Sequence, residues 1–259
     1  MRAVDAWLRC FRVQLKVRVV NPFSWFGVIV QPVVFAVIGL VLFTTSGRTH
    51  GASYAVLGGG LVGLWSATLF NAGYDIESER WTGTLEELFG SATPIGVILA
   101  GKVAASLVPA LASFVLTLAV ALVAFHQVVS VVAPVPLAVS LLLTFAAFYV
   151  MGFLLATVFA SVRITGGFTN SFEIPLYLLC GFMFPASVLP GWVQPLSWAL
   201  APTWTIRAMY AATGQGGPAS YAAWWAVASA LIAANALLAR LLLRVVRTRL
   251  RVSGELATV

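Results

Sequence analysis

The sequence predicts an all-α membrane protein that crosses the bilayer about six times. Of its 259 residues, 61% are hydrophobic and only 9% are charged, whereas soluble domains contain about 25% charged residues. So few charges cannot cover the surface of a water-soluble fold. A spanning helix needs about 20 apolar residues, so six spans occupy most of the chain. We therefore expect residues 1–259 to form a single transmembrane domain.

Residues 1–20 are expected to hold an amphipathic helix that lies in the membrane interface instead of crossing it. Apolar and basic residues follow separate faces at steps of three and four over 3–20. The apolar set is Val4, Trp7, Leu8, Phe11 and Leu15, and the basic set is Arg9, Arg12 and Lys16. Asn21 and Pro22 are expected to end this helix and turn the chain into the bilayer.

The expected spans are long runs that are almost free of charge. They cover 23–43, 51–74, 103–125, 134–162, 174–184 and 219–243. Pro32 lies inside the first run and is expected to kink it. Four glycines within 58–63 allow close approach of neighbouring helices to the second.

The fifth run continues without charge to Ile206 and is broken by several prolines. We expect residues 185–210 to dip into the outer side of the bilayer as a re-entrant segment and return. Non-helical backbone is tolerated at that depth only where it is buried in protein or lines a wet cavity.

The distribution of lysine and arginine predicts that both termini are cytoplasmic. In this topology 13 of the 15 basic residues lie on the inner side and only Arg48 and Arg207 on the outer side. Inverting the topology would invert that ratio. The high alanine, valine and arginine content indicates a bacterial source, so the expected location is the inner (plasma) membrane.

The stretch 75–94 reads DIESERWTGTLEELFGSATP and contains five of the eight acidic residues. We expect a cytoplasmic loop that carries a short helix, capped by Thr84 and stopped by Pro94. Acidic residues in the first turn favour such a helix. Two interpretations stay open for it: a solvated loop with ordinary caps, or a helix that docks on a soluble partner.

Two motifs resemble the ABC type-2 permease family, the membrane half of ATP-binding-cassette exporters. The first matches the family's cytoplasmic loop at Glu79, Arg80, Gly83, Thr84, Leu85, Glu86 and Pro94. The second matches its outer segment at Gly181, Phe184, Pro185, Leu189, Pro190, Trp192, Pro202 and Arg207. The chain departs from the family pattern at Trp81-Thr82, which puts the fine contacts of the loop in question. Asn21-Pro22 and Pro32 also resemble the family.

The resemblance implies a half-transporter. Two permease chains would pair, with the first and fifth spans at the seam, and each would dock a separate ATPase subunit that binds ATP and Mg²⁺. The implied ATPase-coupling residues are Glu79, Arg80, Gly83, Thr84, Leu85, Glu86, Leu88 and Phe89. The implied outer gate consists of Phe184, Pro185, Leu189, Pro190, Trp192 and Pro202.

No cofactor, metal or nucleotide site is expected in this chain itself. Residues 96–102 read GVILAGK, like the start of a P-loop, but Val103 follows where Ser or Thr would be needed for Mg²⁺. Lys102 is instead interpreted as an anchor at the inner membrane face. His50 and His126 are interpreted as ordinary loop residues.

Glu173 is the one acidic residue expected inside the membrane, where charges are costly and usually functional. Two interpretations stay open: a boundary ion pair with Arg163, or a gate or substrate contact together with Asn170 and Phe172. Plain packing is the alternative for the aromatic residues of this region.

The expected function is ATP-driven export of a lipophilic substrate such as a drug, a natural product or a lipid. Export of a glycan or lipid-linked polymer is an alternative within the same class. An ion-coupled secondary transporter would need several ionisable groups at mid-membrane or inverted repeats. A membrane enzyme would need clustered catalytic groups, and the acidic stretch 75–87 is the only cluster.

Overall fold

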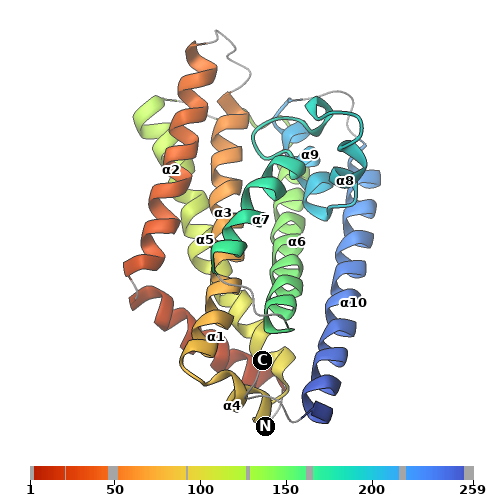
Figure 1. Cartoon of the computed structure of the whole chain (residues 1–259). Coiled ribbons are helices and arrows are strands. Elements are labelled where there is room, and N and C mark those ends of the chain that lie inside the picture. The colour runs from red at the N-terminus through yellow and green to blue at the C-terminus, as the bar shows by residue number, and fades with distance from the viewer. Residues whose placement is uncertain are drawn as a thin grey trace.

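The structure, a computed structural model, describes residues 3–20, 22–45, 52–91, 93–126, 129–161, 166–215 and 220–253. All regular structure within these ranges is helical. The long helices run side by side along one axis (Figure 1). They are α2 (Pro22–Thr45), α3 (Ala52–Trp81), α5 (Ile95–Phe125), α6 (Pro134–Ser161), α7 (Gly166–Cys180) and α10 (Tyr221–Ser253).

Short elements cover the two ends of this bundle (Figure 1). At one end lie α1 (Ala3–Val20) and α4 (Leu85–Gly90), together with the last turns of α10. We call this the α1–α4 end. At the other end, the α8–α9 end, lie η2 (Ala186–Val188), α8 (Gln194–Trp198) and α9 (Ala201–Ala212).

Helix α3 forms the centre of the bundle. It packs against α2, α5, α6 and α7, and every residue from 55 to 69 is buried. Glycines permit this packing: a Cβ at Gly59 would lie 2.8 Å from the Cβ of Ala36, and one at Gly63 would overlap Pro32. The expected role of these glycines in close helix approach is therefore confirmed.

Three helices in the described part of the chain are long and apolar enough to cross a bilayer. Their apolar segments are Ile95–Phe125, Pro134–Ala160 and Tyr221–Val245. Helices α2 and α3 contribute the shorter apolar segments Pro32–Val41 and Tyr54–Leu69. The chain thus has the features of a polytopic membrane protein. The number six stays an expectation, because α7 has 15 residues and a full crossing takes about 20.

Several expected boundaries are wrong: most of these helices extend beyond their apolar runs, and α7 also ends early, at Cys180, before Gly181 at φ +72°. Helix α3 continues through the acidic stretch to Trp81, and α5 begins at Ile95, directly after Pro94. Helix α7 spans Gly166–Cys180 where we expected a connection up to residue 172 and a span to 184. Polar residues alone do not end a helix when other helices supply partners for them.

Helix α1 ends at Val20 and α2 begins at Pro22, so the predicted break is confirmed. The side of α1 that faces the bundle includes polar residues, and its predicted position in the membrane interface stays a prediction. Val4 is 66% exposed, whereas the polar residues Gln14 and Arg18 are buried. Helix α1 packs on α5, and the partners of these two polar side chains belong to the site described next.

Candidate functional site

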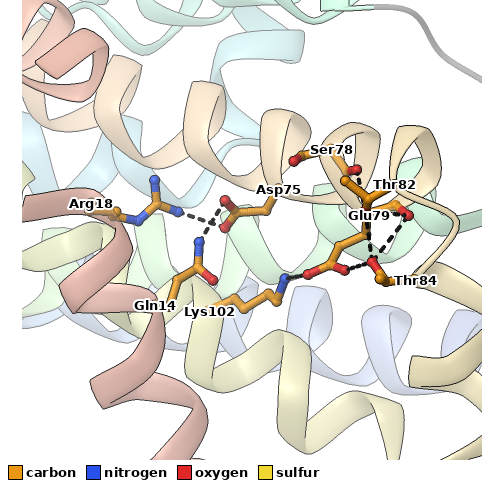
Figure 2. Close-up of polar contacts among 8 residues, drawn as sticks. All are labelled: Gln14, Arg18, Asp75, Ser78, Glu79, Thr82, Thr84 and Lys102. Atoms are coloured by element: carbon orange, nitrogen blue, oxygen red, sulfur yellow. Dashed lines mark hydrogen bonds and ion pairs between the residues drawn. The ribbon is translucent and has the colours of Figure 1, made fainter. Parts of the chain in front are cut away.

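A polar network joins three helices at the α1–α4 end (Figure 2). Gln14 and Arg18 extend from α1, Asp75 and Glu79 from the last turns of α3, and Lys102 from α5. The acidic stretch read from the sequence therefore does not project as a free loop. Two acidic residues of this stretch, Asp75 and Glu79, instead bind α3 to the neighbouring helices.

Asp75 is the most deeply buried carboxylate of this network, with 7% of its surface exposed. Arg18 Nη2 donates to Asp75 Oδ2 at 2.6 Å, and Gln14 Nε2 donates to Asp75 Oδ1 at 2.8 Å. Burial raises the pKa of Asp75 and lowers the pKa of Arg18, and in each case the charge of the partner opposes the shift. Each charge is therefore tolerated only because the other is present.

Glu79 lies one helical turn further along α3 and contacts two other elements. Its carboxylate accepts from Lys102 Nζ and from the Thr84 hydroxyl. Partial burial acts to raise the pKa of Glu79, but the hydrogen bonds from Lys102 and Thr84 and the positive charge of Lys102 outweigh it, so the pKa lies below its ordinary value. Lys102 therefore does more than anchor α5 at the membrane face.

The turn between α3 and α4 is built from Thr82, Gly83 and Thr84. Thr82 Oγ1 donates to the Ser78 carbonyl at 2.9 Å and lies 2.9 Å from Thr84 Oγ1. Gly83 adopts φ +72° in open space, a conformation that glycine accepts without strain. The hydroxyl of Thr84 does not cap α4 as predicted, because it bonds back to Glu79.

The short helix expected after this turn is present as α4, Leu85–Gly90. Leu88 is half-buried and packs against the core, while Glu87 is exposed. Trp81, at the end of α3, is 84% exposed. Arg80, Leu85, Glu86 and Phe89 have their backbone in α3 or α4, and their side chains lie outside the description.

The P-loop-like residues 96–102 are explained by packing. A Cβ at Gly101 would lie 3.0 Å from the Cβ of Cys10 and from the carbonyl of Trp7, so this glycine lets α1 cross α5 closely. Lys102 is paired with Glu79. Among the described residues, no three His, Cys, Asp or Glu side chains are grouped to hold a metal ion.

Glu173 is buried on α7, at the level of the middle of α3. It accepts a hydrogen bond from Ser66 of α3. Arg163 lies outside the described residues, and the side chains of Asn170 and Phe172 are likewise not described, although both belong to α7. The proposed pair of Glu173 with Arg163 therefore stays a prediction.

The residues of the expected outer gate lie at the α8–α9 end. Gly181 (φ +72°) ends α7, and Phe184, Pro185, Leu189, Pro190 and Trp192 form the connection through η2 to α8. Pro202 lies in the first turn of α9. Tyr210 of α9 donates its hydroxyl to the carbonyl of Phe182, which ties this connection to α9. Neither the gate role nor re-entry into the bilayer is tested by this geometry.

Three members of the network, Gln14, Arg18 and Asp75, were not predicted from the sequence, and neither was the exposure of Trp81. Gln14 and Arg18 were not recognised as an i, i+4 pair on one face of a helix, and Asp75 was read as part of a loop. Trp81 was noted only as a departure from a motif, and its exposure could not be known. The ion pair could have been predicted from a basic residue, Arg18, and an acidic residue, Asp75, at the same expected membrane depth.

Comparison with known protein families gives one match. The family described as ABC-2 type transporter matches residues 5–213, which include α1, the polar network, α4 and the whole α8–α9 end. The comparison with curated proteins found no match. Since the family match covers most of the chain, the protein belongs to the ABC-2 type transporter family.

Proposed function

We propose that the chain is the permease subunit of an ATP-driven exporter in a bacterial inner membrane, with both termini in the cytoplasm. Family membership supports a membrane subunit that works with an ABC ATPase. The scarcity of charge along the bundle supports a lipophilic substrate such as a drug, a natural product or a lipid. ATP and Mg²⁺ are bound by the separate ATPase subunit, and a second permease chain completes the transporter.

The observation that carries the proposal is the construction of the α3–α4 turn. Helix α4 and Trp81 extend from the bundle, and Trp81 is exposed although it is large and apolar. Behind them, Glu79 holds both Thr84 and Lys102. A protruding apolar contact on a rigid support is the form expected of a surface that receives force from a partner protein. We assign ATPase docking to this turn and to α4.

The α8–α9 end is the exit side in this proposal. The distribution of basic residues supports that orientation, because they lie along α1 and in the last turns of α10. The connection 181–200 would close the pathway from outside, with Phe184, Pro185, Leu189, Pro190, Trp192 and Pro202 as its gate.

The docking assignment is tested with two exposed tryptophans at opposite ends of the molecule. Trp81 is 84% exposed and Trp192 is 80% exposed, so both alanine variants remove a similar surface. The permease is co-purified with its candidate ATPase, and ATP hydrolysis is measured in proteoliposomes. We expect Trp81→Ala to weaken complex formation about tenfold, as for an interface hot spot. Trp192→Ala is expected to leave the complex intact.

Equal complex formation by both variants and wild type would show that docking does not occur at this turn. ATP-independent transport that collapses with the proton gradient would instead place the protein among ion-coupled transporters. The direction of transport is read from the same vesicles by comparing inside-out and right-side-out preparations.

A further inference from the structure

The α8–α9 end contains a pocket of about 450 Å³, within the range of sites for small ligands. Its walls come from five helices: Tyr54 of α3, Trp198 of α8, Trp204 and Arg207 of α9, Trp224 of α10, and the end of α7. The lining combines several aromatic rings with one positive charge. None of these residues takes part in the polar network of the opposite end.

Arg207 supplies that charge and is held in place by an aromatic ring. Its Cζ lies 4.8 Å from the centroid of the Trp224 ring, a cation–π distance that fixes the guanidinium without neutralising it. The side chain remains exposed, so its N–H groups can reach a ligand.

Among the described residues, no carboxylate forms an ion pair with Arg207. The sequence contains no Asp or Glu between 174 and 254, which includes η2, α8, α9 and α10. The nearest acid in the sequence, Glu173, is bonded to Ser66 in the middle of α3. In contrast, Arg18 and Lys102 at the α1–α4 end each have a carboxylate partner.

The aromatic residues around the pocket are of the kind that lies at the depth of lipid headgroups. Trp192 and Trp198 are exposed, and Trp204 Nε1 donates to the Trp198 carbonyl at 2.8 Å. The ring of Tyr221 packs edge-on against Trp224 and at a tilt against Trp225 at the start of α10. Tryptophan and tyrosine with one wet and one apolar side gather at membrane–water interfaces.

From these observations we infer that the pocket binds the anionic headgroup of a membrane phospholipid. The planar guanidinium of Arg207 forms paired, charge-assisted hydrogen bonds with a phosphate. The aromatic walls contact the glycerol region, and the apolar surface of α10 is open to an acyl chain, since Val227 and Leu237 are exposed. A zwitterionic choline headgroup is disfavoured, because its own cation would lie beside Arg207.

The inference is tested by native mass spectrometry of the detergent-solubilised full chain. The protein is titrated in separate arms with dioleoyl-phosphatidylglycerol, dioleoyl-phosphatidylcholine and inorganic phosphate. We expect phosphatidylglycerol to bind most tightly. Arg207→Gln is expected to weaken that binding about tenfold, as for the loss of one charge-assisted contact, and to change phosphatidylcholine binding little. No ATPase is needed, so the result is independent of the proposed docking.

Two control variants locate the binding. Arg240→Gln removes an exposed arginine of α10 outside the pocket and should keep wild-type affinity. Ser187→Trp fills the pocket from its exposed rim while leaving Arg207 in place, and should weaken binding as much as Arg207→Gln does. Full phosphatidylglycerol binding by Arg207→Gln, or by Ser187→Trp, would overturn the inference. Inorganic phosphate that displaces the lipid would show that the phosphate group is what the pocket recognises.

Discussion

Arg18 in α1 and Asp75 in α3 form a buried ion pair at 2.6 Å between residues 57 positions apart in the sequence. The pair fixes the N-terminal helix to the end of the central helix. Neither charge is stable in this buried position without the other, so the stability of the protein should depend on the pair.

Removing one member of the pair should destabilise the fold strongly. Arg18→Ala leaves Asp75 buried without its counter-charge, which costs about 3–5 kcal/mol in comparable sites. The double variant Arg18→Met with Asp75→Leu should recover most of that loss, since it removes both charges and keeps the volume. Denaturant unfolding in detergent measures both, with Arg12→Ala, an exposed arginine of the same helix, as the control. A single variant as stable as wild type would contradict the pairing.

The bond from Lys102 to Glu79 should produce an acid-dependent loss of stability. The pKa of Glu79 is lower in the folded protein than its ordinary value of 4.5, so its contribution is complete above that value. It is lost as the pH falls through the lower, folded-state pKa. Glu79→Gln should therefore flatten the fall in thermal stability below about pH 4.5.

Glu87→Gln is the matched control for that measurement, because Glu87 is an exposed residue of α4. Glu87→Gln should show the same dependence of thermal stability on pH as wild type. If Glu79→Gln and wild type lost stability in parallel on acidification, Glu79 would not be held by Lys102 and Thr84.

Gly63 should tolerate no side chain, whereas Gly90 should accept one. A Cβ at Gly63 would overlap Pro32 of α2 and lie 2.5 Å from Ser113 Oγ of α5. Gly63→Ala should therefore cost about 1–3 kcal/mol through overpacking. At Gly90 no atom lies within 4 Å of the added Cβ. Thermal unfolding of the two alanine variants compares them directly, and equal midpoints would contradict the close packing of α2, α3 and α5.

Tyr210→Phe should loosen the connection between α7 and α9. The buried hydroxyl donates to the Phe182 carbonyl, and its loss leaves that carbonyl without the bond, at a cost of about 1–3 kcal/mol. Hydrogen exchange of the segment 181–200 should rise in this variant. Tyr221→Phe keeps the ring contacts with Trp224 and Trp225 and should leave that exchange unchanged.

Much of the fold could be predicted because hydrophobicity and helix breakers act locally. Pro22 marks the start of α2 and Pro134 the start of α6, as predicted from the sequence. The glycines of α3 were also assigned their packing role correctly. These features depend on a few neighbouring residues.

The contacts of the polar network were not predicted, because its partners are distant in sequence. Asp75 and Glu79 looked like loop residues, yet the helix continues through them since Arg18 and Lys102 satisfy their charges. Thr84 was expected to accept a hydrogen bond from a backbone N–H of α4, but its hydroxyl is oriented to donate to the carboxylate of Glu79, five residues earlier. The roles of these residues in docking stay predictions.

Helix α3 also joins the two ends of the molecule without interruption. Its 30 residues correspond to about 45 Å at 1.5 Å per residue. Tyr54, near its start, lines the pocket, and Trp81 ends it beside α4. Because neighbouring helices enclose the middle of α3, this helix can tilt or slide only as a rigid body. A displacement of Trp81 at the α1–α4 end would therefore move Tyr54 at the α8–α9 end directly, with no need for a relay of side chains.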